Sequence, residues 1–330
     1  MSRRPRSPHR AAHPTGARPS RFAGARAAIA LASAAAIAAA VAAGFAAASE
    51  PKLLFASGFE APVQISTATG RGNADQYLSG GDVEGFEWPP ALWDTPPRYR
   101  GWVLSIVGND VPHDITHYAR NTIKTVTGRD GAPTRALSLN ATAASEHTDV
   151  QQTNVKHAYL KREPIVYQRM WVKFDVNTLA RAQAVGAPDF FQIFWEIKAD
   201  PDYRIRLQLE YREGHGLLWQ AQGDVLKNAR PLWQARLTKV PVVLAPHSSA
   251  EGWHKVEVWI DRPGGRFRAA IDGVDLVDRR GPLMGASGNT MSQFMYMVQY
   301  SPTSPVSVVT ETLFDDLELW DAPPPDAWRR

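Results

Sequence analysis

Four cationic or amide side chains and one tyrosine occupy alternate positions in segments with a two-residue hydrophobic period. They are Arg169, Gln192, Arg204, Arg206 and Tyr167. A guanidinium or an amide can neutralise a carboxylate, and a tyrosine can move a proton if a neighbouring Arg lowers its pKa. These groups therefore suit β-elimination next to a carboxylate. They are equally typical of the solvated face of an antiparallel sheet, so the residue types alone leave both interpretations open.

Carboxylates offer a second kind of chemistry. Glu196 and Glu210 fall on the expected polar faces of two segments that could be neighbouring strands, and Glu257 is a third candidate. A pair of carboxylates can hydrolyse a glycosidic bond. Phe194, however, stands between Gln192 and Glu196, where a second acid on the same face of the strand would be needed. Hydrolysis is therefore less favoured than elimination.

Aromatic side chains on the same expected polar faces suit carbohydrate binding without catalysis. Sugar rings stack their C–H faces on aromatic rings, and planar polar groups bind the hydroxyls. The candidate binding residues are Trp171, Lys173, Phe194, Arg204, Gln208 and Trp259. The alternative is that residues 66–101 cover the aromatic rings, since exposed aromatic surface usually has a partner.

These residues are positioned by segments in which apolar and polar side chains alternate, as they do in half-buried strands. The expected polar faces are Tyr167, Arg169, Trp171 and Lys173 in 166–174; Gln192, Phe194, Glu196 and Lys198 in 191–198; and Arg204, Arg206, Gln208 and Glu210 in 204–211. A slip of one residue in 204–211 would bury two arginines and a glutamate, so its register is strongly specified.

Residues 252–277 are typical of three antiparallel strands. Turn signals at Arg262-Pro263-Gly264-Gly265 and at Asp272-Gly273 separate the three alternating runs. One apolar face of such a meander needs a second sheet to cover it. Because no helical pattern alternates with these strands, the sequence predicts an all-β fold, a two-sheet antiparallel β-sandwich.

The charge of the chain is unevenly distributed. The whole chain has 37 Lys and Arg against 33 Asp and Glu, or +4, and its first fifty residues hold seven Arg and one Glu. Without them the balance is 30 against 32, or −2. The basic pI therefore belongs to the N-terminal segment, and we expect no nucleic-acid partner. The absence of Cys excludes disulfides and a lipoprotein anchor.

The chain divides into segments of different composition. Residues 1–26 are basic and expected to be disordered, and residues 27–48 are an uncharged, Ala-rich run typical of a signal peptide. We expect a secreted or periplasmic protein. The run is long enough to span a bilayer, so a retained membrane anchor is the alternative, and membrane contact is expected only through this segment. Residues 50–322 should form a single domain with an irregular part at 66–130, and residues 323–330 a Pro-rich tail.

Seven segments follow one another in a familiar order from Leu53 to Trp320. They are FASGFE, YQRMWVKFD, FFQIFWEIK, YRIRLQLEY, GWHKVEVWID, QFMYMVQYS and FDDLELW. This order resembles the concanavalin A-like jelly rolls, in particular the polysaccharide-lyase-like branch with heparin-, glucuronan- and alginate-lyase relatives. The resemblance implies that a concave sheet holds a polysaccharide, here an acidic one because arginines line that face. It also implies that Arg169, Gln192 and Arg206 surround one groove.

The chain departs from this family at two places. The alginate-type families carry Gln-x-His in the segment that corresponds to FFQIFW, whereas this chain has Gln192 followed by Phe194. Those families also place a Lys and a Tyr on the late strand. In this chain, strict alternation would put Gln299 on the groove face and turn Tyr296 and Tyr300 away from it.

The resemblance further implies a structural Ca²⁺ between the first and last strands, with Glu60, Asp315 and Asp316 as oxygen ligands. No cofactor is expected for catalysis. His113 and His117 lack a third ligand, which favours a surface loop. We therefore expect an exported jelly-roll protein that engages a polysaccharide. One expected activity is that of a lyase, which cleaves an acidic polysaccharide by β-elimination. The alternatives are a non-catalytic carbohydrate-binding module and a cell-envelope structural or adhesion protein.

Overall fold

The computed structural model describes eleven stretches of the chain. They are residues 50–66, 74–82, 85–90, 102–107, 121–141, 150–158, 166–199, 203–225, 230–281, 291–302 and 309–329. The basic segment and the Ala-rich run expected at residues 1–48 lie outside the described residues, as do His113 and His117. Within the described residues, no helix is both long enough and apolar enough to cross a membrane.

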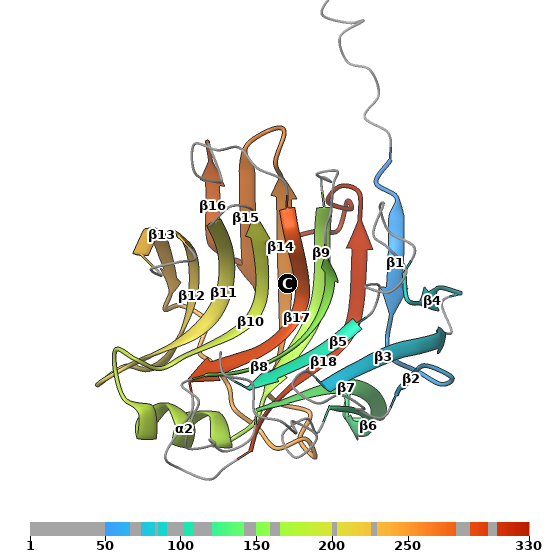
Figure 1. Ribbon diagram of the computed structural model, residues 1–330, viewed down its shortest axis with the longest axis horizontal. Helices are drawn as coiled ribbons and strands as arrows, with labels where there is room; N and C mark the ends of the chain where they lie inside the picture. Colours follow the sequence, from blue (N-terminus) through green and yellow to red (C-terminus); the bar gives the residue numbers. More distant parts are fainter. Residues whose placement is uncertain are drawn as a thin grey trace, which may run out of the picture. The chain divides into compact units, whose positions relative to one another are not determined.

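The larger sheet has ten strands, and its curved central strands are labelled in Figure 1. Its order is β13 (Arg230–Leu237), β12 (Gly216–Val225), β11 (Tyr203–Arg212), β10 (Phe191–Ala199), β17 (Met291–Pro302), β8 (Val150–Ala158), β5 (Trp102–Val107), β3 (Ala74–Gly81) and β2 (Gln64–Ile65), with β4 (Glu87–Trp88) paired to β3. The strands β3 to β5 fall within residues 66–130, as does β6 of the other sheet, so the described part of the segment expected to be irregular contains strands.

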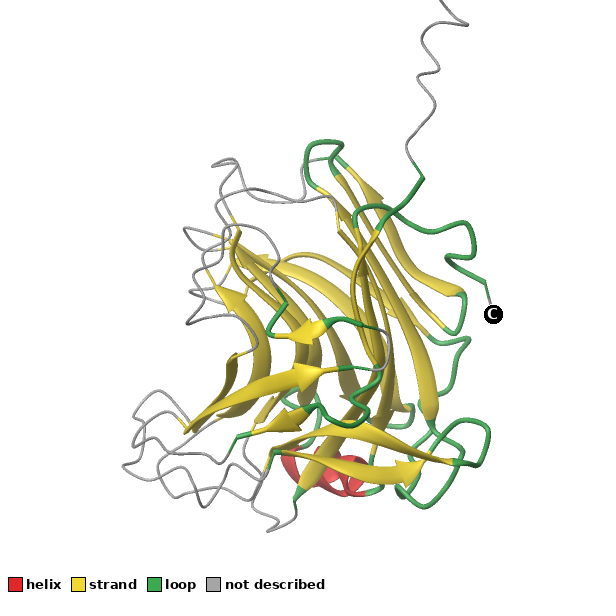
Figure 2. Ribbon diagram, turned by 90° about the vertical axis from the view of Figure 1, so that its right-hand side faces the viewer, coloured by secondary structure: helices red, strands yellow, loops and turns green. Residues whose placement is uncertain are grey.

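The smaller sheet has eight strands and packs against the larger one (Figure 2). Its order is β16 (Val274–Arg280), β15 (Arg266–Ile271), β14 (Trp253–Asp261), β9 (Val166–Phe174), β18 (Thr310–Trp320), β7 (Pro133–Ala141) and β6 (Thr122–Thr127), with β1 (Leu53–Ser57) paired to β18. The paired strands are antiparallel, and the chain crosses repeatedly between the two sheets. The predicted all-β jelly-roll sandwich is confirmed. A helix that the sequence did not predict, α2 (Asn177–Val185), connects β9 to β10.

The core lies between the two sheets and follows the predicted alternation in β11. Ile205, Leu207 and Leu209 are fully buried and belong to one apolar cluster with Met170 and Val172 of β9. Each such side chain contributes on the order of 1.5–3 kcal/mol to the free energy of folding. The register predicted for β11 is thus confirmed, and its polar residues face away from the core.

Two β-bulges break the alternation in the neighbouring strands β10 and β17. In β10 one extra residue, Phe194, falls between the register pairs Ile193–Gln208 and Trp195–Leu207. In β17 one extra residue falls between Met295 and Met297, relative to β8. A bulge reverses which side chains face outward beyond it. The prediction that Gln192 and Phe194 share the polar face of Glu196 was therefore wrong.

Candidate functional site

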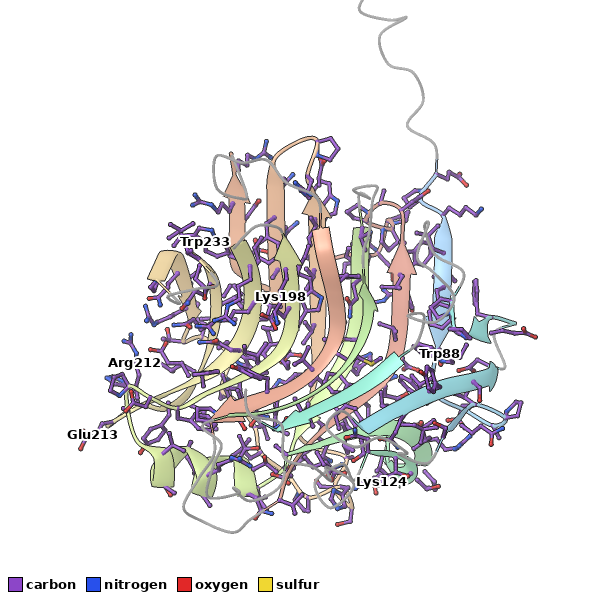
Figure 3. All side chains as sticks on the ribbon, in the orientation of Figure 1. Trp88, Lys124, Lys198, Arg212, Glu213 and Trp233 are labelled. Carbon is purple, nitrogen blue, oxygen red and sulfur yellow. The ribbon has the colours of Figure 1, made fainter. Side chains whose placement is uncertain are left out.

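The outward face of the larger sheet carries a continuous polar network, which we call the β11 face. Its members come from β10, β11, β12 and β13, and Lys198 and Arg212 lie toward its two ends (Figure 3). They are Glu196, Lys198, Arg204, Arg206, Gln208, Glu210, Arg212, Gln220, Gln222, Asp224, Gln234 and Arg236. Most of these side chains are nearly buried, so their hydrogen bonds are electrostatically stronger than those on a solvent-exposed surface.

Arg204 is the central cation of this network. Its Nε donates to Asp224 at 2.7 Å, and its other guanidinium nitrogen lies 3.4 Å from Glu196. Asp224 is fully buried and also accepts from Gln222 at 2.7 Å. Arg204 is thus fixed by two carboxylates, which gives it a positioning role in the network.

Arg206 is less well compensated than Arg204. Among the described residues its nearest carboxylate oxygen is on Asp224, 3.4 Å from Nε, and Nε makes no hydrogen bond. Its guanidinium lies over the Phe191 ring at 5.1 Å. Burial, together with the neighbouring Arg204, lowers the pKa of Arg206 to about 10. An anion placed beside Arg206 would relieve this cost.

The β-bulges bring an aromatic and apolar patch onto the same face. Ile193 and Tyr300 are register partners, and they form a small cluster with Phe191 and Val298 that is separate from the main core. The Tyr300 ring lies 5.6 Å from the Phe191 ring. Tyr300 also interacts electrostatically with Arg204 and Arg206. Sequence reasoning missed Tyr300 because strict alternation turned it away from this face.

Gln192 and Phe194, expected on the groove face, lie inside the sandwich. Gln192 donates to Gln299 at 3.0 Å and to Thr312 of the smaller sheet at 3.1 Å. Phe194 packs in the main core, with its ring 5.6 Å from that of Phe174. The physical reason is the bulge at Phe194, which gives β10 two successive core residues.

The expected catalytic residues of β9 lie on the other sheet, on the opposite side of the sandwich from Arg206. Arg169 donates to both oxygens of Glu318 and pairs with Asp326 at 2.7 Å. Tyr167 is buried and bonded to Glu257. Burial, and then this hydrogen bond, raise the pKa of Tyr167 above its usual range, whereas a base would need it lowered. The structure therefore does not bring Arg169, Gln192 and Arg206 around one groove.

The C-terminal residues 321–329 cover this part of the smaller sheet. The Trp328 ring packs edge-on against Tyr167 at 5.3 Å, and its backbone N–H donates to Glu257 at 2.7 Å. The Arg268 guanidinium lies over the Trp328 ring at 4.1 Å from its centroid. The expected Pro-rich tail is thus a packed part of the domain.

The remaining expected binding residues also divide between the sheets. Trp171, Lys173 and Trp259 lie on the smaller sheet, and Gln208 lies on the β11 face. Lys173 is fully buried and donates to the Ser249 carbonyl, and burial lowers its pKa. The Arg266 guanidinium lies over the Trp259 ring at 4.8 Å from the ring centroid. Gln208 donates to Gln220, while its carbonyl oxygen is buried without a hydrogen bond.

The carboxylates Glu196 and Glu210 are too far apart for paired hydrolysis. Glu196 is the register partner of Arg206, and Glu210 comes four residues later on β11. At about 3.3 Å per residue this is roughly 13 Å along the strand. Glycosidase carboxyl pairs are separated by roughly 5–10 Å. Glu210 is held by Arg236 at 2.7 Å and by Arg212 at 3.1 Å.

The three expected calcium ligands lie near the junction of β1 and β18, where Thr134 links Glu60 to Asp315 and Arg129 links Asp315 to Asp316. Thr134 donates to Glu60 and to Asp315, each at 3.3 Å. The Arg129 guanidinium, however, pairs with Asp316 and lies 3.9 Å from Asp315. Among the described residues, no group of three His, Cys, Asp or Glu side chains is arranged to hold a metal. A guanidinium thus occupies the position beside the two aspartates, and the structural Ca²⁺ stays a prediction.

Comparisons with known proteins identify no family for this chain. No family model matches it, and no curated protein matches it. Among solved structures it is similar to an alginate lyase in complex with an alginate tetrasaccharide (14% identity, 61% of this chain and 82% of that one, TM-score 0.36). It is also similar to LamA from Z. galactanivorans in complex with laminaritriose and laminaritetraose (9% identity, 82% and 98%, TM-score 0.41). A third is a gut-microbiota O-glycanase (9% identity, 81% and 98%, TM-score 0.42). Likeness at this level concerns the fold alone.

Proposed function

We propose that the protein acts on an acidic polysaccharide at the β11 face and cleaves it by β-elimination. The observation that carries this proposal is the charge balance around Arg206. Among the described residues, the buried Arg206 shares its carboxylate, Asp224, with Arg204, and Glu196 also pairs with Arg204, so the charge of Arg206 is incompletely compensated. A buried cation of this kind favours an anionic ligand group, such as a uronate carboxylate.

Arg206 would neutralise the carboxylate of the substrate. Arg204 is held by Asp224 and Glu196, whereas the Arg206 Nε lies 3.4 Å from Asp224, its one ion pair among the described residues, and makes no hydrogen bond. Neutralising the C6 carboxylate stabilises the negative charge that develops when the C5 proton leaves. The unpaired carbonyl oxygen of Gln208 could accept a sugar hydroxyl beside it.

Tyr300 is the candidate proton-transfer group. Arg204 and Arg206 lie close enough to interact with it electrostatically, so negative charge on its oxygen would be stabilised. As the base, Tyr300 would take the C5 proton while the C4–O bond breaks and the C4–C5 double bond forms. The same proton would then pass to the departing oxygen, which leaves the tyrosine ready for the next cycle.

The test is turnover of uronate-containing polysaccharides, followed by the ultraviolet absorbance of the unsaturated product. Tyr300→Phe should abolish product formation and keep polysaccharide binding, and Arg206→Ala should lose both. Tyr77→Phe and Arg266→Ala are matched controls, because both residues lie away from the β11 face. Product formation that survives Tyr300→Phe would contradict the proposal.

A non-catalytic carbohydrate-binding module is the second candidate. The Phe191–Tyr300 ring pair, flanked by glutamine amides, offers the aromatic and planar polar groups that sugars need. Binding that depends on Arg206, with no product from any uronate polymer, would favour this function. Binding and product both absent would favour a structural or adhesion protein.

We further propose that residues 1–48 export the protein. Their basic start and uncharged Ala-rich run support a signal peptide over a retained anchor. The N-terminal sequence of the protein recovered from the periplasm or the medium tests this. A start near Ser49 or Glu50 is expected, and recovery of the intact chain in the membrane fraction would favour the anchor.

A further inference from the structure

Trp171 on the smaller sheet has surroundings that the proposed function does not use. β9 directs Tyr167, Arg169, Trp171 and Lys173 outward, and the two ends of this row are covered. Trp328 and Asp326 contact the first two residues, and the Ser249 carbonyl accepts from Lys173. Trp171 lies between these covers and is only partly buried. The Arg129 guanidinium lies over the Trp171 ring at 4.3 Å from its centroid, and the remaining part of the ring lines a hollow.

Two hollows meet at Trp171. The larger, of about 700 Å³, is lined by Trp171, Lys239, Val240, Pro241, Lys255, Asp272 and Val274. A second, of about 320 Å³, shares Trp171 and Lys255 and extends toward Arg129 and Glu318. Trp171 and Lys255 are register partners on β9 and β14, so they form the wall common to both. The larger volume suits a ligand of one or two sugar rings.

The lining of the larger hollow combines apolar surface with unequal charge. Trp171, Val240, Pro241 and Val274 supply surface on which a sugar ring can pack. Lys239 is exposed and makes no ion pair with a described residue, and Lys255 pairs with Glu257 at 3.2 Å.

Asp272 is the carboxylate of this lining, and it is already engaged. It binds His254 at 2.8 Å and the backbone N–H of Lys255 at 2.8 Å. Lys255 also donates to the Arg329 carbonyl, so Lys239 is the cation of this lining that no described carboxylate pairs.

We propose that this hollow is a second glycan-binding site, specific for a sugar that carries a carboxylate. The sugar ring packs on Trp171, and its carboxylate faces Lys239 and Lys255. Because the site lies on the opposite sheet from Arg206, it holds a polysaccharide strand without taking part in the elimination. The protein would thus attach to its polymer at one face while the β11 face is free to engage another segment.

Isothermal titration calorimetry of the full chain tests the proposal, with trisaccharides of alginate and of polygalacturonate as uronate probes. Laminaritriose serves as the neutral probe. We expect two sites in the wild type for at least one uronate probe and weaker binding of laminaritriose. Lys239→Glu and Trp171→Ala should each remove one site, and Arg206→Ala should remove the other.

Lys239→Glu is the decisive variant, because this exposed side chain can change without disturbing the fold. Lys52→Glu, another exposed lysine, is its matched control. Unchanged binding in Lys239→Glu, equal binding of laminaritriose, or no binding of either uronate probe would each overturn the proposal. If the β11 face binds nothing, one site that is lost in Lys239→Glu still supports the Trp171 site, so the two proposals can fail separately.

Discussion

Gln192 on β10 donates a hydrogen bond of 3.0 Å to Gln299 on β17, and both side chains are fully buried between the sheets. Both were expected on the groove face. Their inward orientation and the outward orientation of Tyr300 have one cause, because the extra residues in β10 and β17 reverse the alternation of both strands.

Gln192→Ala should reduce stability and leave the chemistry intact. The variant leaves the partners Gln299 and Thr312 buried with one hydrogen bond fewer, which costs on the order of 1–3 kcal/mol. Urea unfolding measures the loss, and the turnover of the folded fraction should match the wild type. A selective loss of turnover at unchanged stability would contradict this placement.

Arg204→Ala should lower the stability of the fold far more than Arg206→Ala. Removing Arg204 leaves Glu196 and Asp224 without their principal cation, and breaking a buried pair costs about 3–5 kcal/mol. Removing Arg206 also removes its own desolvation cost, so we expect a loss of roughly 1 kcal/mol or less. Thermal unfolding of both variants and uronate binding by Arg206→Ala decide the matter. Equal destabilisation would show that the two arginines play the same role.

Asp315→Asn should change the pH dependence of stability. Burial, and then the neighbouring Asp316, raise the pKa of Asp315 from 3.8 to about 7. Between these values the native carboxyl keeps a proton that the unfolded chain releases, so this group makes stability fall as pH rises from about 4 to about 7. The variant lacks this dependence and should gain roughly 1–4 kcal/mol relative to the wild type across that range. Urea midpoints at pH 5 and pH 8 measure it, and parallel curves would contradict it.

Arg129→Ala should make stability depend on calcium. In the wild type the guanidinium pairs with Asp316 and lies near Asp315, so chelators should leave the unfolding temperature unchanged. Without it, two aspartates, Glu60 and the Thr134 hydroxyl form a set of hard oxygen donors.

Millimolar Ca²⁺ should therefore raise the unfolding temperature of the Arg129→Ala variant, because an ion that binds only the folded state stabilises it. Mg²⁺ is the matched control. A wild-type protein that loses stability in a chelator would instead support the structural Ca²⁺ expected from the family resemblance.

The faces of a strand could be predicted where the strand has no bulge, because successive side chains then point to opposite faces of the sheet. Arg204, Arg206, Gln208 and Glu210 alternate without interruption with Ile205, Leu207 and Leu209, and the structure has the predicted faces. β9 was equally regular, but alternation says nothing about which sheet a strand joins. Arg169 and Arg206 were therefore grouped although they lie on opposite sheets.

The bulges could not be predicted, because they leave the composition of the strand unchanged. Phe194 and Trp195 are successive aromatic residues that are both fully buried, and the sequence alone allows either one to face outward. The same uncertainty concealed Tyr300. The signal that could have revealed the bulge is the run Phe190-Phe191-Gln192-Ile193-Phe194-Trp195, which holds more apolar side chains than one face of a short strand can accept.

The position of β18 has a consequence for how the chain folds. This strand pairs with β1, β7 and β9, and the Lys52 backbone N–H reaches Asp321 at a separation of 269 residues. The smaller sheet therefore cannot close until residue 320 has been synthesised, and closing such long loops is slow. A ribosome-bound or partly translocated chain remains open, with the inner faces of both sheets accessible. The time between synthesis and closure is therefore the period in which aggregation competes with folding.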